Sequence, residues 1–153
     1  MAINKQPVFT TTPILTLRIY DPEVVTAAYN PSSCLTSTSK IFTSTDSYGT
    51  LIERITVSST GDTSYTTVTA KLIYLYLYYD VKSSWSLYKT AAMPALTISD
   101  TTPNAEIEWV FTGGLLLPVN FQIFIGASTN SVATGQKGDY LSVTVEGSTY
   151  TQV

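Results

Sequence analysis

The chain has no histidine and only one cysteine, Cys34. Histidine is the commonest general base and the commonest metal ligand in proteins, so the most frequent catalytic and metal-binding arrangements are excluded. A single cysteine cannot close an intrachain disulfide, and without histidine it cannot belong to a Cys–His nucleophile pair. We interpret Cys34 as a small buried or half-buried thiol.

Charged residues are also scarce, at 12% of the chain against a usual share of ~25%. The 8 lysines and arginines are scattered and the net charge is −3, so the basic patch of a nucleic-acid-binding protein is missing. No apolar stretch approaches the ~18 residues of a membrane helix, and the first residues lack the apolar core of a signal peptide. We expect no nucleic-acid partner, no membrane partner, and synthesis in a cytoplasm.

What the chain does contain favours β-structure. Hydrophobic residues make up 44% of it, Ser and Thr together more than a quarter, and there are 11 tyrosines. Thr, Val, Ile and Tyr suit a pleated, half-buried surface, whereas long helices favour Ala, Leu, Glu, Lys and Arg. A neutral Ser/Thr-rich surface also means that solubility does not depend on charge, which suits a protein packed against copies or partners.

Strand signals recur along the chain with turn residues between them, and no window carries the apolar stripe of a helix. We predict an all-β fold, an antiparallel β-sandwich that is jelly-roll-like and has about 8–9 strands. In the segment 51–58, Leu51, Glu53, Ile55 and Val57 are expected to share one face, and the glycines at 113–114 are expected to form a turn. The predicted strands are 14–20, 24–29, 40–44, 51–58, 66–79, 85–90, 105–112, 121–125 and 140–146.

The chain is expected to form a single domain. Residues 1–50 are less regular and are interpreted as an N-terminal arm or as edge strands, and residues 51–153 as the β-sandwich core. Residues 149–153 are interpreted as an edge strand or an arm.

Three tyrosines stand two residues apart in the longest strand candidate, 66–79, and we call Tyr74, Tyr76 and Tyr78 the tyrosine ladder. Alternate residues of a strand share one face, so the three rings lie on the same side. The opposite face is apolar as well, which predicts a central strand covered on both sides. The ladder is a candidate interface or stacking surface: the favoured interpretation is core or subunit interface, and the alternative is a sugar-binding platform.

Glu106 and Glu108 are the best-placed pair of carboxylates, two apart on one strand and roughly 7 Å from each other at the backbone. They alternate with Ile107, Trp109 and Phe111, which we expect to face inward, so the two glutamates have the pattern of a solvated face. We predict no catalytic residues, no cofactor and no metal ligands. Four isolated turn aspartates are interpreted as turn residues, with an interloop calcium site as the lesser alternative: Asp62, Asp80, Asp100 and Asp139.

One further signal lies in the order of short phrases along residues 51–146. These phrases are IERITVSSTG at 52–61, LYLYYD at 75–80, WSLY at 85–88, PNA at 103–105, GLLLP at 114–118 and GAST at 126–129. In this order the chain resembles a family of small virion structural proteins encoded by tailed bacteriophages. Residues 1–50 lie outside the resemblance, and the strand after residue 140 extends beyond the point where the family tends to end.

The resemblance implies a β-sandwich that sits on the virion as a capsid-associated or other accessory protein. We therefore expect a non-enzymatic structural protein, namely an auxiliary or decoration protein bound to the capsid. Its expected partners are the major capsid protein or another virion protein, and further copies of itself. One alternative is a tail, collar or head-fibre component, another is a carbohydrate- or receptor-binding β-sandwich module, and a hydrolase using Glu106 or Glu108 ranks last.

Overall fold

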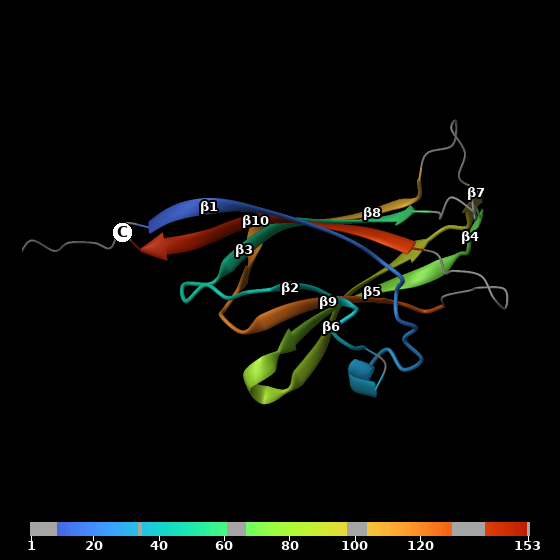
Figure 1. Ribbon diagram of the computed structural model, residues 1–153, viewed down its shortest axis with the longest axis horizontal. Helices are drawn as coiled ribbons and strands as arrows, with labels where there is room; N and C mark the ends of the chain where they lie inside the picture. The colour runs from blue at the N-terminus through green and yellow to red at the C-terminus, as the bar shows by residue number, and fades with distance from the viewer. Residues whose placement is uncertain (1–8, 34, 61–66, 98–103, 130–139, 153) are drawn as a thin grey trace, which may run out of the picture.

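A computed structural model describes residues 9–33, 35–60, 67–97, 104–129 and 140–152, which form two four-stranded antiparallel sheets and one two-stranded ribbon (Figure 1). The first sheet has the order β1 (Phe9–Tyr20), β10 (Tyr140–Gln152), β3 (Thr50–Thr60), β8 (Glu106–Leu117). The second sheet has the order β2 (Lys40–Thr43), β9 (Phe121–Ala127), β5 (Lys71–Tyr79), β6 (Ser84–Met93). The ribbon pairs β4 (Thr67–Val68) with β7 (Leu96–Thr97), and the helical turns are η1 (Pro31–Ser33) and η2 (Asp80–Lys82).

The strand order is that of a jelly roll. Without the ribbon, the sheets contain four nested antiparallel pairs: β5 with β6, β3 with β8, β2 with β9, and β1 with β10. Successive pairs along this nest lie alternately in the second and the first sheet, as if one long hairpin were wound around the core. The predicted fold class, a jelly-roll-like antiparallel β-sandwich, is confirmed.

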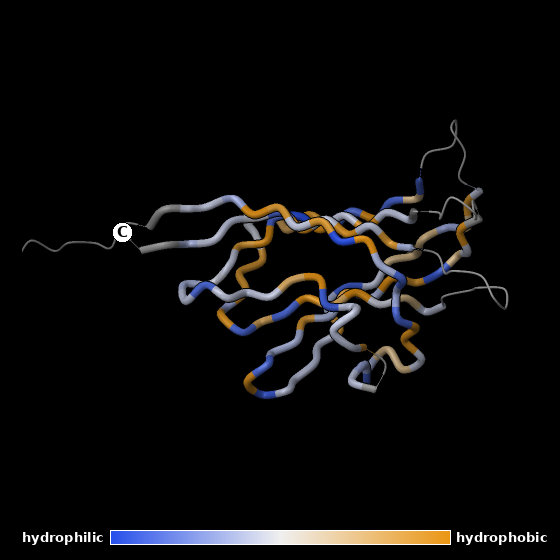
Figure 2. Tube along the Cα trace, viewed as in Figure 1, coloured by the Kyte–Doolittle hydropathy of each residue, from blue (hydrophilic) through white to orange (hydrophobic). Residues whose placement is uncertain are grey.

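The main core fills the space between the sheets, to which strands of both contribute apolar residues (Figure 2). Leu141, Val143 and Val145 of β10 have no exposed area. The inward face predicted for 105–112 is confirmed, because Ile107 is buried while Trp109 and Phe111 pack half-buried against the core.

Two of the expected strands are wrong. The segment 24–29 forms no strand, and its one ladder contact is a parallel bridge between Val24 and Ala127. The segment 66–79 is divided, since β4 ends at Val68 and β5 begins at Lys71. The sequence also predicts a turn at residues 60–62 and a loop at 130–138, and these fall largely or wholly outside the described residues.

The glycines at 113–114 do not turn the chain into a new strand. Gly113 and Gly114 have φ values of 78° and 79°, and they form an outward excursion within β8, after which pairing with β3 resumes. Residues 149–152 likewise continue β10, where Thr149 still pairs with both β1 and β3 and residues 150–152 pair with β1.

Opposite this excursion, the alternation of inward and outward side chains along β3 is also interrupted. Arg54 pairs with Val110 and Ile52 with Leu115, so Glu53 is left over as a bulge. The expected shared face of Leu51, Glu53, Ile55 and Val57 is therefore wrong for its first half, because Ile52 is buried and Leu51 is not. A bulge adds one residue and moves every earlier side chain to the other face.

We predict that Ile55→Ala lowers the free energy of unfolding by about 2–5 kcal/mol, because Ile55 is fully buried and its truncation leaves a cavity. Val110→Ala, one strand away on the outer face, is the matched control and should cost less than ~1 kcal/mol. Urea unfolding followed by circular dichroism measures both changes. Similar small costs at the two positions would show that the inward face of β3 is assigned wrongly.

Candidate interaction surface

The tyrosine ladder does not form an open surface. Tyr74 and Tyr76 are buried and Tyr78 is half-buried, although all three lie on the side of β5 that faces away from the main core. Residues 22–35, here called the cover segment, pack over them through Val25 and Leu35 and create a second hydrophobic core. For these first two rings the favoured interpretation of the ladder as core holds, and the alternative of an open stacking surface is wrong, because they are internal packing.

Specific contacts hold the cover segment on the second sheet (Figure 1). Tyr76 donates its hydroxyl hydrogen to the Ala28 carbonyl oxygen at 2.8 Å. The backbone N–H of Val25 donates to the Ala127 carbonyl oxygen at 2.8 Å, and the Ala127 N–H donates to the Glu23 carbonyl oxygen at 3.1 Å. The chain itself therefore covers the part of this outer face around Tyr74 and Tyr76, while Leu72 on the same side of β5 stays 42% exposed.

Glu23, near the start of the cover segment, binds Thr36, the residue that follows the segment's end. The Thr36 N–H donates to its carboxylate at 2.7 Å, and the Thr36 hydroxyl donates to the other carboxylate oxygen. Partial burial disfavours the charged form, but hydrogen bonds to the carboxylate, among them those from Thr36, outweigh it and lower the pKa of Glu23.

The outer face of the first sheet, in contrast, exposes a row of large apolar side chains along β1. Leu15, Leu17 and Ile19 are 73%, 63% and 61% exposed, and we call them the apolar edge. Their outward direction follows from the residues between them. Arg18 donates to the Lys40 carbonyl oxygen and Tyr20 donates its hydroxyl hydrogen to the Ile125 carbonyl oxygen at 2.7 Å, so the even-numbered residues face inward.

The inward side of β1 is consistent with this orientation. Burial raises the pKa of the Tyr20 phenol, while the Arg18 guanidinium 5.6 Å from its ring centroid acts in the opposite direction. The buried hydroxyl of Tyr20 needs its hydrogen-bond acceptor. A β1 strand with its two faces exchanged would bury the apolar edge but would leave that hydroxyl without the acceptor.

Beyond the apolar edge, the outer face becomes neutral and then charged. Across the sheet, Leu17 lies beside Thr144, Thr144 beside Thr56, and Thr56 beside Glu108. The row next to it ends in Glu106. The face thus passes from apolar on β1, through small hydroxyl residues, to acidic on β8.

Glu106 and Glu108 are engaged in cross-strand contacts. Glu108 forms an ion pair of 3.2 Å with Arg54, which also binds Glu146, and Glu106 accepts a hydrogen bond of 3.3 Å from the Ser58 hydroxyl. The hydrogen bonds from Arg54 to Glu146 and Glu108 raise the pKa of Arg54. Both glutamates are exposed on a flat sheet and do not face one another across a cleft, which is the solvated arrangement that the sequence pattern indicates.

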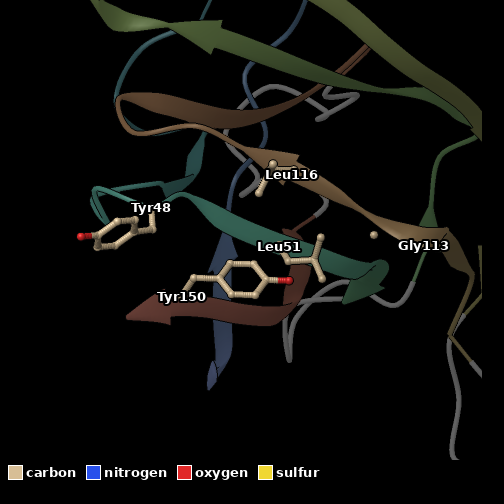
Figure 3. A pocket seen from close by; sticks show the side chains of 6 residues that line it. Tyr48, Leu51, Gly113, Leu116 and Tyr150 are labelled. Atoms are coloured by element: carbon tan, nitrogen blue, oxygen red, sulfur yellow. The ribbon is translucent and has the colours of Figure 1, made fainter. Parts of the chain in front are cut away.

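A shallow hollow lies at the other end of the same face. It has a volume of about 480 Å³ and is lined by Tyr48, Leu51, Gly113, Gly114, Leu116 and Tyr150 (Figure 3). We call it the glycine hollow, because the excursion of β8 forms one of its walls. A Cβ atom added to Gly114 would lie 2.3 Å from a methyl carbon of Leu51, so a side chain there would displace the hollow's floor.

The remaining sequence candidates contribute no site in the described part of the chain. There, no group of three or more potential metal ligands is found, and Asp80 lies in the η2 turn, where its carbonyl oxygen accepts the Ser83 N–H. Cys34, Asp62, Asp100 and Asp139 lie outside the described residues. Among the described residues, no helix is long and apolar enough to cross a membrane.

The apolar edge was not predicted from the sequence. Leu15, Leu17 and Ile19 alternate with Thr16 and Arg18, which by itself would place the apolar set in the core. The signal that could have identified it is Pro13, because a proline within a strand indicates an edge.

Comparisons with known proteins add little to this geometry. No family model matches the chain, and no curated protein matches it. Among solved structures, the globular domain of zebrafish complement 1qA protein is similar over 90% of this chain and 96% of that domain, with a TM-score of 0.43 and 9% identity. Similarity at this level does not bear on function.

We predict that Glu23→Gln loosens the cover segment and lowers the free energy of unfolding near neutral pH by about 0.5–1 kcal/mol, a loss kept small by solvent exposure. Folding lowers the pKa of Glu23 below its ordinary value, so the wild-type advantage is complete above that ordinary value. It disappears as the pH falls through the lower pKa of the folded state. Urea unfolding across this range, with Glu53→Gln as the exposed control, measures the effect; an unchanged difference in acid would contradict it.

Proposed function

We propose that this chain is a non-enzymatic structural protein of a tailed-bacteriophage virion, an auxiliary or decoration protein bound to the capsid. The observation that carries the proposal is the outer face of the first sheet, which no described segment covers, with its apolar edge of Leu15, Leu17 and Ile19. The resemblance of residues 51–146 to small phage virion proteins supplies the setting. On the particle, the partner is the major capsid protein or another virion protein.

An exposed apolar row on a soluble protein indicates a surface that meets a partner. Leu15, Leu17 and Ile19 are all more than half exposed, and hiding them contributes about 1–2 kcal/mol each. The small Ser and Thr side chains beside Leu17 and Ile19 allow close approach, whereas the row that begins at Leu15 carries the ion pair of Glu146 with Arg54, whose desolvation a contact there would have to offset. Affinity on such a face comes from area and repetition over many copies, which suits a shell-covering protein.

A position in the tail, in the collar or on a head fibre is the nearest alternative, because the same face could serve there. Copy number separates these locations. Hundreds of copies in a particle correspond to a shell-covering decoration protein, whereas a dozen or a few dozen correspond to vertices, collar or tail.

The experiment is quantitative mass spectrometry on intact, gradient-purified particles from the source, with copy number referred to the major capsid protein. We expect this chain to be present in stoichiometric amount. Its absence from purified particles would refute the virion role.

Two valine substitutions test the face itself. Val110 lies on the outer face of the first sheet and is 64% exposed, and Val81, in the η2 turn, is matched to it at 65% exposure. We predict that Val110→Lys reduces binding to particles lacking the native protein by at least ~10-fold, because an ammonium group must then be desolvated at the contact. Val81→Lys should bind as wild type. Equal binding by the two variants, both folded by circular dichroism, would place the contact elsewhere.

A carbohydrate- or receptor-binding module is the second candidate, and the glycine hollow is what favours it. Tyr48 and Tyr150 place two rings at a hollow of about 480 Å³ whose other walls are apolar or glycine. Aromatic rings beside an open floor can stack on the apolar face of a sugar ring while their hydroxyls reach its polar rim.

We predict for this candidate that Tyr150→Ala and Tyr48→Ala each weaken the binding of a glycan ligand by at least ~10-fold, and that Tyr88→Ala, an exposed tyrosine on β6, does not. A glycan array followed by calorimetry measures it. An array without a hit would exclude the sugar-binding role and leave the virion role untouched.

A further inference from the structure

The free edge of β1 is the starting point. β1 ends the order of the first sheet, and in the described part of the chain β10 is its one ladder partner. It is 12 residues long and carries the apolar edge. Natural proteins usually protect an edge strand with charges, prolines, bulges or short length, because unpaired N–H and C=O groups pair readily with another strand. In β1, Pro13 protects the edge before Leu15, and the one charged side chain, Arg18, faces inward. Leu15, Leu17 and Ile19 offer none of these protections.

Pro13 shows which backbone groups lie on that free edge. Proline has no N–H, and inside a sheet it is tolerated where its nitrogen faces away from the paired neighbour. Residues two apart in a strand point their backbone groups in the same direction. The N–H and C=O groups of Leu15, Leu17 and Ile19 therefore face the free edge, and those of the even-numbered residues face β10.

We propose that this edge pairs antiparallel with the same edge of a second copy of the chain, with Leu17 opposite Leu17 of the second copy. The inference deepens the proposed structural role, on which its place in an assembly rests. A two-fold axis beside Leu17 joins the first sheets of two copies into one continuous sheet and leaves both outer faces on the same side.

Three neighbouring registers keep the exposed backbone groups of the two copies opposite one another. Their two-fold axes lie beside Thr16, Leu17 and Arg18, respectively. A pair centred on Thr16 places Pro13 opposite Ile19, where proline has no N–H to donate. A pair centred on Arg18 sets two guanidinium-bearing residues directly opposite each other, which is destabilising.

The register centred on Leu17 avoids both faults. It sets Leu15 opposite Ile19 and Arg18 opposite Thr16, so all three exposed apolar side chains gain apolar partners across the new ladder. Pro13 falls just outside the paired segment.

Disulfide trapping tests the register in a Cys34→Ser background. Directly opposed residues in such a pair have Cα atoms ~5.5 Å apart, within the range of a disulfide. Leu17→Cys alone should therefore form a covalent dimer under mild oxidation at low protein concentration. Leu15→Cys should not, because its two copies lie about 14 Å apart along the strands. An equal mixture of Leu15→Cys and Ile19→Cys should cross-link to about half the extent of Leu17→Cys, because about half of randomly formed pairs are mixed.

We expect dimer formation by Leu17→Cys to be at least ~10-fold faster than by Leu15→Cys alone. Equal rates at the two positions would show unspecific contact of edges, and a disulfide between Leu15→Cys and Leu17→Cys in their mixture, resolved by mass from the Leu17→Cys homodimer, would show a different register; either result overturns the proposal. Sedimentation of Leu17→Lys, expected to be monomeric where the wild type is dimeric, is independent of thiol chemistry, and an unchanged sedimentation coefficient would overturn the proposal as well.

The two proposals fail separately. If the chain is found on particles but Leu17→Cys does not cross-link, the self-pairing is wrong and the virion role stands. If Leu17→Cys cross-links with the predicted specificity but purified particles lack the chain, the pairing stands and the virion role falls. Protection of β1 from hydrogen exchange by particles alone, without dimerisation, would assign the edge to a strand of the partner instead of a second copy.

Discussion

Tyr76 lies on the outer side of β5 with no exposed area, and its hydroxyl donates to the Ala28 carbonyl oxygen. A buried phenol needs both a ring-sized apolar enclosure and a hydrogen-bond acceptor, and neither the second sheet nor solvent supplies them together. The cover segment supplies both. Because β5 is central in its sheet and apolar on both sides, the second sheet depends on this contact for the closure of its outer face.

This closure has a consequence for the other sheet. The connection between β1 and β2 packs against the second sheet, where Val25 and Leu35 join the ring cluster of Tyr74, Tyr76 and Phe124. In the described part of the chain, the outer face of the first sheet keeps its exposed side chains, including Leu15 on β1 and Val110 on β8. The sandwich is thus asymmetric: the chain itself packs over the middle of one outer face, and the other presents apolar, hydroxyl and paired charged groups.

The fold class could be predicted because its signals are local. Alternation identifies β3, β8 and β10 as strands with one inward face, and the double-sided apolar pattern identifies β5 as central. The bulge at Glu53 and the excursion at Gly113 and Gly114 could not be predicted, because a bulge is decided by pairing with a neighbour that the local sequence does not name.

The candidate surface was harder to predict for a related reason. Alternating apolar residues such as Leu15, Leu17 and Ile19 predict a strand face that points into the core. The prediction fails here because the residues between them have hydrogen-bond partners in the interior. Those partners are acceptors distant in sequence, the carbonyl oxygens of Lys40 and Ile125. Likewise Val24 and Val25 have the composition of a strand, and the three-dimensional position of the ladder decides that they form a cover.

The register of β1 against β10 has a topological consequence. Phe9 is paired with Gln152, so the two ends of the described strands leave the sandwich at one corner, with Cα atoms only ~5 Å apart. A short peptide could join them without distorting either strand, which makes the fold a candidate for circular permutation with new ends in an exposed hairpin such as η2. For the same reason, cargo fused at either end of the described strands would be carried at the same corner.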